Sequence, residues 1–186
     1  MLQILEDILI NNNLFIEVSS GNLKHSSCPS TTINVLDFEE IKKKFCDKIG
    51  LPNAQCCSCD ALLISKKKDE MNLIEMKRIS ANITDECFIE QQGPIIANQF
   101  IDSILLILSL VGYYKIDEQF YSYFFNRARF KKKYWLLSNF SNDQLITSTL
   151  INFNRLGIAV ATKGFYKEEI GIISCETFNT QFASVA

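Results

Sequence analysis

The spacing of apolar residues alternates between helical and extended patterns along the chain, and these patterns predict its elements. Apolar positions three or four apart predict helices over residues 2–10, 37–49, 94–113, 118–129 and 142–156. Continuous or alternating apolar runs predict strands near residues 14–18, 57–65, 72–79, 134–137, 158–161 and 170–175. Residues 19–32 are mostly polar and are expected to form a loop.

Residues that favour helix ends sharpen two of these boundaries. Asp37 is expected to cap the start of the 37–49 helix, with Glu40 completing a capping-box-like pair. Gly50 is expected to end the same helix, as glycine often does. Pro94 is expected to open the 94–113 helix, because proline is tolerated in a first turn.

The order of the strands predicts the sheet. The strands 57–65 and 72–79 would pair as an antiparallel hairpin, and the strand–helix–strand run over 134–161 indicates a parallel crossover. Together they predict an α/β fold with a mixed central sheet flanked by helices. Because no repeat or linker-like stretch interrupts the chain, we expect one domain over 1–186 with its core at 37–161.

Composition and charge narrow the cellular location and the partners that we expect. The chain has 186 residues, of which 47% are hydrophobic, and a formal net charge of −2, so a nucleic acid would need a local basic patch. The first residues include acids where a secretory signal would be basic, and the most apolar stretch, 104–111, is too short to cross a bilayer. We therefore expect a cytoplasmic protein with no membrane partner.

The cysteines are expected to be reduced thiols. There are seven, an odd number, and Cys56 and Cys57 are adjacent, which does not suit a disulfide framework. A zinc or iron–sulfur site near Cys59 would need distant partners. The residues available for this are Cys28, Cys46, Cys87 and His25. We favour buried cysteines on a strand over a metal site.

Three polar residues in the predicted hairpin carry the candidate chemistry. Asp60 precedes the apolar run of the first strand, and Glu75 and Lys77 lie two apart on the second, so their side chains share a face. The hairpin would bring Asp60 close to Glu75. Two carboxylates on neighbouring strands suit Mg²⁺ or Mn²⁺, and Lys77 would stabilise charge on a reacting phosphate.

The pattern of Asp60, Glu75 and Lys77, with an apolar lead-in and a following helix, resembles that of the PD-(D/E)xK nuclease superfamily. The resemblance covers residues 37–112. It implies a restriction-endonuclease-like core and metal-dependent hydrolysis of DNA or RNA phosphodiesters, as in small nucleases of defence, mobile-element or toxin systems. It also implies that Asp60 and Glu75 bind the metal and that Lys77 completes the catalytic set.

The chain departs from that family pattern near the first acid. Cys59 stands where the family has a proline. The family often has a further glutamate on the helix before the strands, and four residues compete for this role: Glu6, Glu17, Glu39 and Glu40. Gln99, on the helix after Lys77, is expected to face the site.

A basic segment interleaved with aromatic residues provides a candidate substrate contact. Its cations are Arg127, Arg129, Lys131, Lys132 and Lys133. Such a mixture predicts contacts with the phosphates and bases of a nucleic acid. The alternative, slightly favoured, is a solvated helix end that leads into a buried strand.

A second function stays open on the same scaffold, that of a non-catalytic protein-binding protein of the immunity or inhibitor type. The slightly acidic charge and the missing proline at Cys59 favour it. Its partner would be a protein rather than a nucleic acid, and a homodimer is compatible with either function.

Overall fold

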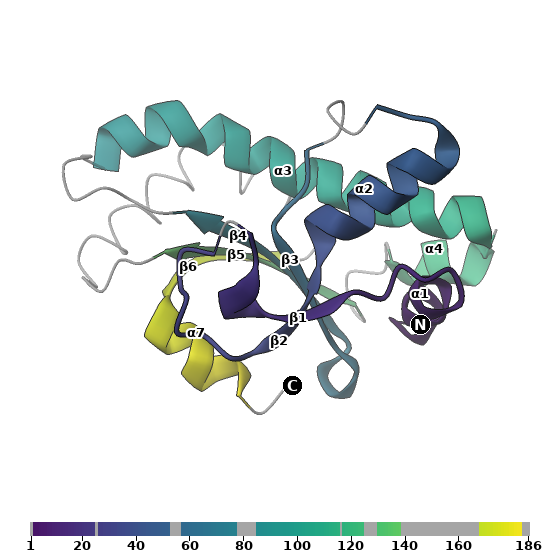
Figure 1. The fold of residues 1–186 in the computed structure, drawn as a ribbon, viewed down its shortest axis with the longest axis horizontal. Helices are drawn as coiled ribbons and strands as arrows, with labels where there is room; N and C mark the ends of the chain where they lie inside the picture. Colours follow the sequence, from purple (N-terminus) through teal and green to yellow (C-terminus); the bar gives the residue numbers. More distant parts are fainter. Residues whose placement is uncertain are drawn as a thin grey trace.

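The described part of the chain is organised around a six-stranded sheet (Figure 1). The computed structural model describes residues 2–24, 26–52, 57–77, 85–115, 117–124, 130–138 and 168–183. The strands are β1 (Glu17–Ser19), β2 (Asn34–Asp37), β3 (Ala61–Ser65), β4 (Glu70–Lys77), β5 (Lys131–Ser138) and β6 (Glu168–Ser174). The helices are α1 (Leu2–Asn11), α2 (Phe38–Ile49), α3 (Asp85–Tyr114), α4 (Glu118–Phe124) and α7 (Cys175–Phe182), with 3-10 turns η1 (Ser20–Asn22) and η3 (Lys66–Lys68).

The sheet is mixed, and its strands lie in chain order from β1 to β6. Strands β1 to β4 pair antiparallel with their neighbours, whereas β4 pairs with β5, and β5 with β6, in parallel. The predicted α/β class with a mixed sheet flanked by helices is therefore confirmed. The sheet also includes strands on either side of the predicted 37–161 core.

Two apolar clusters cover the two faces of the sheet. Helices α1 to α4 pack on one face, where the buried side chains include Leu5, Phe38, Leu73, Ile107 and Phe120. Helix α7 and the segment before β2 pack on the other, with Cys28, Leu63, Ile74, Leu137 and Phe178. Figure 1 shows α3 running across the first face and α7 lying against the second. Both faces of β3 are buried, as its continuous apolar run predicts.

Helix α2 forms where the sequence predicts it. Asp37 is its N-cap, and the carboxylate accepts a hydrogen bond from the backbone N–H of Glu40 at 3.0 Å. This satisfies one of the N–H groups that a helix start leaves unpaired. At the other end, Gly50 adopts a left-handed conformation with φ of 71°, which glycine reaches without steric cost.

Replacing Asp37 by alanine tests this cap. The Asp37→Ala variant should lose about 1 kcal/mol of unfolding free energy, because the N–H of Glu40 loses its acceptor. Urea unfolding followed by circular dichroism measures the change. Asp47→Ala, at an exposed position in the last turn of α2, is the matched control and should not destabilise the protein. Equal unfolding midpoints for the two variants would contradict the role of the cap.

Several predicted boundaries differ from the structure. Helix α3 begins at Asp85, so Pro94 lies inside it instead of opening it. Proline removes one backbone hydrogen bond, and a helix of 30 residues keeps enough others to continue past it. The first hairpin strand begins at Ala61, and strand β2 was not predicted at all. Four predicted elements lie wholly or partly outside the described residues: the end of the 72–79 strand, the end of the 118–129 helix, the 142–156 helix and the 158–161 strand.

Cys28 and Cys175 form a disulfide, which corrects the prediction that the cysteines are reduced thiols. The two residues are 147 positions apart, so no local spacing of cysteines predicts the bond. They meet because the segment before β2 and the start of α7 pack on the same face of the sheet. Cys46, Cys57 and Cys59 do not take part in this disulfide.

Within the described ranges, none of the helices has an apolar stretch that is long enough to span a lipid bilayer.

Candidate functional site

The sheet register brings Asp60 and Glu75 together at one end of the β3–β4 hairpin. Ala61 of β3 pairs with Ile74 of β4, so Asp60, the residue before Ala61, lies beside Glu75. Lys77 follows two residues later on the same face of β4. The structure thus gathers the three residues that the sequence singled out, which we call the hairpin cluster.

The hairpin cluster faces α3. Side chains alternate along a strand, so Glu75 and Lys77 point to the same side as Leu73. Leu73 belongs to the apolar cluster that includes Ile107 of α3. The carboxylates are therefore set against the longest helix of the protein.

Short polar contacts fix the three side chains. Asp60 Oδ2 accepts a hydrogen bond from the backbone N–H of Met76 at 2.7 Å. Glu75 Oε1 forms an ion pair with Lys77 Nζ at 2.8 Å. The side chain of Glu75 is 1% exposed and that of Lys77 is 26% exposed, so the lysine is the solvent-facing member of the pair.

The environment of Glu75 favours its protonated form. Burial, followed by the nearby charge of Asp60, raises the pKa of Glu75 from 4.5 to about 8, although Lys77 and Gln99 act in the opposite direction. Two carboxylates that share a buried site in this way repel each other when both are ionised. A cation between them would remove that repulsion.

Helix α3 positions the residues next to the hairpin cluster. Ser103 Oγ accepts a hydrogen bond from the backbone N–H of Cys59 at 2.8 Å and donates one to the carbonyl oxygen of Gln99 at 2.6 Å. These bonds tie the residue before Asp60 to α3. Ser103 was not among the site residues predicted from the sequence, although its spacing of four from Gln99 puts both on one helix face.

Two buried oxygens next to the cluster have no hydrogen-bond partner among the residues that the structure describes. They are Glu75 Oε2 and Gln99 Oε1. A buried acceptor without a partner costs about 1–3 kcal/mol. Carboxylate and amide oxygens are also ligands of Mg²⁺, so these two oxygens have the chemistry that such a cation requires. The residues present therefore fit such a cation.

Asp60 and Glu75 would be the only carboxylates offered to this cation by the described ranges. Over those ranges, no group of three or more His, Cys, Asp or Glu side chains is arranged to hold a metal. Mg²⁺ commonly binds through one or two carboxylates and keeps several waters, so two carboxylates are sufficient. Cys59 adds nothing to the site, because burial raises the pKa of its thiol well above the usual value.

Three of the four glutamates that are candidates for the upstream role have another place in the structure. Glu6 forms an ion pair with Lys66, and Glu40 forms one with Lys43 at 3.5 Å. Glu17 is exposed on β1. None of these three, nor Glu39, is among the groups that shift the pKa of Glu75.

Lys132 of the predicted basic segment points into the protein. Its side chain is 2% exposed, and its Nζ donates a hydrogen bond to the carbonyl oxygen of Phe124. The ammonium also lies 4.4 Å and 4.6 Å from the ring centroids of Phe124 and Phe130. The Lys132 side chain therefore makes its contacts inside the protein.

The other cations of that segment differ in their accessibility. Lys133 forms an ion pair with Glu70 at 3.0 Å, whereas Lys131 is exposed at the start of β5. Arg127 and Arg129 lie outside the described residues. A role in holding substrate stays a prediction, and Lys131 is its most accessible described member.

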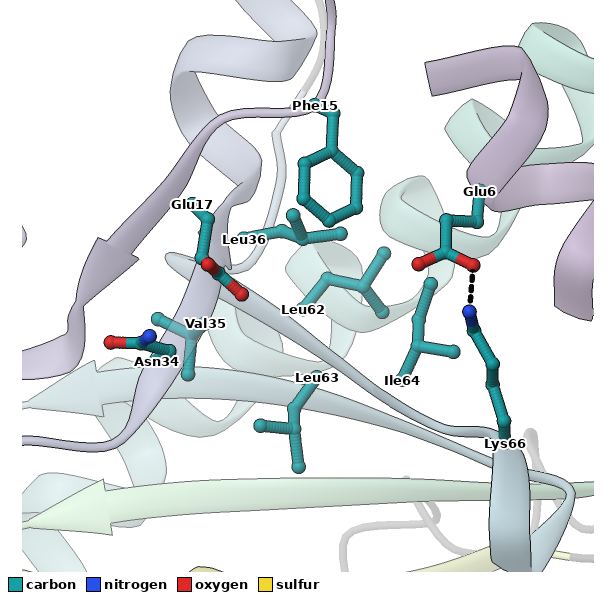
Figure 2. A pocket seen from close by; sticks show the side chains of 10 residues that line it. All are labelled: Glu6, Phe15, Glu17, Asn34, Val35, Leu36, Leu62, Leu63, Ile64 and Lys66. Atoms are coloured by element: carbon teal, nitrogen blue, oxygen red, sulfur yellow. Dashed lines mark ion pairs between the residues drawn. The ribbon is translucent and has the colours of Figure 1, made fainter. Parts of the chain in front are cut away.

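A pocket of about 140 Å³ lies away from the hairpin cluster, where β3 continues past its pairing with β2 (Figure 2). Leu36, Leu62 and Ile64 supply apolar walls, and the Glu6–Lys66 ion pair lies at one end. The pocket shares no residue with the cluster. It is therefore separate from the candidate site.

Comparisons with protein-family models, with curated proteins and with solved structures find no match to this chain.

Proposed function

We propose that the protein is a Mg²⁺- or Mn²⁺-dependent nuclease that hydrolyses nucleic-acid phosphodiester bonds. The observation that carries the proposal is the hairpin cluster itself. Asp60 and Glu75 lie side by side, Lys77 pairs with Glu75 at 2.8 Å, and Glu75 Oε2 is buried without a hydrogen-bond partner among the described residues.

The arrangement of elements supports a restriction-endonuclease-like core. The two acids and the lysine lie on an antiparallel hairpin, β3–β4, which is followed by the long helix α3. Strand β5 then returns beside β4 in parallel. This is the order of hairpin, helix and strand that the resemblance to PD-(D/E)xK nucleases implies.

In this proposal the two carboxylates of the hairpin cluster share one role and its lysine has another. Asp60 and Glu75 would hold the divalent cation, which supplies Lewis-acid stabilisation of the charge on the phosphate and leaving oxygens when it is bound. Lys77 is partly exposed, so its ammonium can face both Glu75 and a phosphate. We assign it to electrostatic stabilisation of the transition state. The backbone N–H of Met76 orients Asp60.

Two alanine substitutions test the proposed site. Asp60→Ala and Lys77→Ala should each lower Mg²⁺-dependent cleavage of DNA or RNA by about 10²–10³-fold, because the first removes a ligand of the cation and the second removes positive charge that stabilises the transition state. Lys43→Ala, at an exposed lysine of α2, is the matched control and should cleave like the wild type. Single-turnover cleavage of labelled DNA and RNA, with and without metal, measures the effect. Cleavage that persists in both site variants would rule out this assignment.

A non-catalytic protein-binding function is the second candidate, and one observation favours it. Glu75 is 1% exposed and already paired with Lys77, as in a structural ion pair. If that is its role, calorimetric titration with Mg²⁺ or Mn²⁺ would show no binding, and the wild type would not cleave either nucleic acid. Metal binding that is lost in Asp60→Ala would favour the nuclease.

A further inference from the structure

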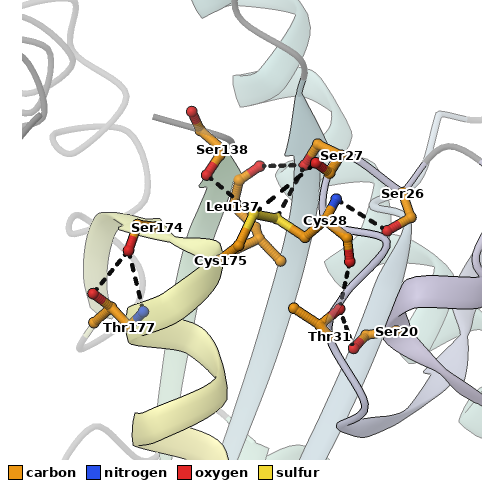
Figure 3. Close-up of a disulfide and its surroundings, with 10 residues drawn as sticks. All are labelled: Ser20, Ser26, Ser27, Cys28, Thr31, Leu137, Ser138, Ser174, Cys175 and Thr177. Atoms are coloured by element: carbon orange, nitrogen blue, oxygen red, sulfur yellow. Dashed lines mark hydrogen bonds between the residues drawn. A yellow bond between two sulfur atoms is a disulfide. The ribbon is translucent and has the colours of Figure 1, made fainter. Parts of the chain in front are cut away.

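The Cys28–Cys175 disulfide lies where the parallel strands β5 and β6 end (Figure 3). Cys28 belongs to a segment, residues 26–33, that we call the disulfide loop. Cys175 is the first residue of α7 and directly follows the last residue of β6, Ser174. The bond thus joins the N-terminal part of the chain to its last described strand and helix.

The disulfide loop is also attached to the end of β5. Ser27 Oγ donates a hydrogen bond to the carbonyl oxygen of Leu137 at 3.2 Å, and Cys175 Sγ lies 3.5 Å from the carbonyl oxygen of Ser138 (Figure 3). Ser138 is the last residue of β5 and is fully buried. The loop, the disulfide and α7 therefore meet at the final two residues of this strand.

The same strand end lies beside the hairpin cluster. In the parallel β4–β5 pairing, Ser138 is the partner of Lys77, and Leu136 is the partner of Glu75. A displacement of β5 at Ser138 would be transmitted to Lys77 through this ladder. The disulfide is thus one strand away from the residue that we assign to the phosphate.

The disulfide loop has internal bonds that do not depend on the disulfide. Thr31 Oγ1 donates to the carbonyl oxygen of Cys28 at 2.8 Å and accepts from Ser20 Oγ at 2.8 Å, and the N–H of Cys28 donates to Ser26 Oγ at 3.2 Å. A reduced Cys175 thiol would find a ready acceptor in the carbonyl oxygen of Ser138. The polar groups of the disulfide loop and of Cys175 therefore have hydrogen-bond partners in both the oxidised and the reduced protein.

The two sulfurs differ in how easily a reductant can reach them. Cys28 is 1% exposed, whereas Cys175 is only partly buried at the N-terminus of α7. Cys175 Sγ is thus the sulfur that a reductant can reach.

We propose that Cys28 and Cys175 form a reversible thiol–disulfide exchange site for a dithiol reductant, whose reduction loosens the disulfide loop and α7 from the end of β5. One thiolate of the dithiol attacks Cys175 Sγ, the S–S bond breaks, and Cys28 leaves and takes a proton. The second thiolate then attacks the mixed disulfide, and Cys175 leaves as a thiolate. Two electrons pass from the dithiol, which becomes a disulfide, to the two cysteines.

The proposal has a regulatory part that rests on the proposed nuclease function. Loosening Ser138 would disturb the position of Lys77 in the neighbouring strand. Because small displacements of a catalytic group are costly, reduction should lower metal-dependent cleavage by about 10- to 100-fold.

The experiment equilibrates the full-length protein in buffers of reduced and oxidised dithiothreitol. Alkylation and mass spectrometry measure the thiol state of Cys28 and Cys175, and hydrogen–deuterium exchange measures local opening. We expect reversible reduction, with exchange in residues 26–33 and 175–183 faster on the order of tenfold, while β3 stays protected over the same labelling times. The double variant Cys28→Ala/Cys175→Ala should show the faster exchange in every buffer. Cys57→Ser, at an exposed cysteine outside this disulfide, should respond like the wild type.

Two results would overturn the proposal. The first is a disulfide that resists dithiothreitol until the protein unfolds, or whose reduction exposes β3 to exchange as quickly as residues 26–33 and 175–183, since the bond would then be a fixed structural requirement. The second is reduction without a change in exchange at residues 26–33 and 175–183. The thiol state and the hydrogen–deuterium exchange are measured without reference to activity. Absence of cleavage in every redox state would therefore reject the nuclease function and leave the thiol–disulfide exchange site in place.

Discussion

Raising the pH from 5 to 9 should destabilise the metal-free protein through Glu75 alone by on the order of 4 kcal/mol. The cause is the burial of this carboxylate beside Asp60, which raises the pKa of Glu75 to about 8 in the folded protein. In the unfolded chain the same group titrates near 4.5. Between these two values the folded state holds a proton that the unfolded state has released.

The direction of the effect follows from that proton. Because the folded state binds more protons, unfolding free energy falls as the pH rises. The stability that the protonated Glu75 contributes is fully present below about pH 4.5 and is lost as the pH rises through about 8. Most acidic groups behave in the opposite way, since their pKa is usually lowered by folding.

Glu75→Gln isolates this contribution. Glutamine is neutral at every pH and similar in shape, so the variant should lack the loss of stability that the wild type shows between pH 5 and 9. Urea unfolding at pH 5, 7 and 9, with a chelator present, gives the two pH profiles. Glu39→Gln, at a partly exposed position on α2, is the matched control and should follow the wild type. Parallel profiles for wild type and Glu75→Gln would show that Glu75 titrates normally.

Removing the disulfide should have an effect of similar size. The Cys28→Ala/Cys175→Ala variant should lose about 3–5 kcal/mol of unfolding free energy, because the bond joins residues 147 apart and restricts the unfolded chain. This is a large part of the 5–15 kcal/mol that holds a typical domain folded, and the variant should still fold.

Urea unfolding with and without a reductant measures the contribution of the bond. The oxidised wild type should unfold at a higher urea concentration than the variant, and reduced wild type should approach the variant. The midpoint of the variant should not respond to the reductant. Equal midpoints for the variant and the oxidised wild type would mean that the bond does not stabilise the folded protein.

Local sequence signals predicted those elements whose cause is local. Asp37 and Gly50 delimit α2 through hydrogen bonding and a left-handed turn, both of which depend on residues only a few positions away. The apolar run of β3 predicted a strand buried on both faces. The hairpin likewise brought Asp60 beside Glu75, because antiparallel register follows from the turn between the strands.

Features that depend on distant parts of the chain were beyond the reach of such signals. Ser103 supports Cys59 from another element 44 residues away, and Cys175 meets Cys28 across 147 residues. Lys132 was interpreted as a surface cation, yet its ammonium is buried between two phenylalanine rings. These pairings are set by how helices and strands pack, which is a property of the whole fold.

The order of the strands has a consequence for how the protein is made. Each strand of the sheet is a neighbour of the one before it in the chain, from β1 through β6. A ribosome delivers the chain from its N-terminus, so each of the strands β2 to β6 is synthesised after a strand with which it pairs. The Cys28–Cys175 bond includes the first residue of α7. It can therefore form only after the strands β1 to β6 have been synthesised.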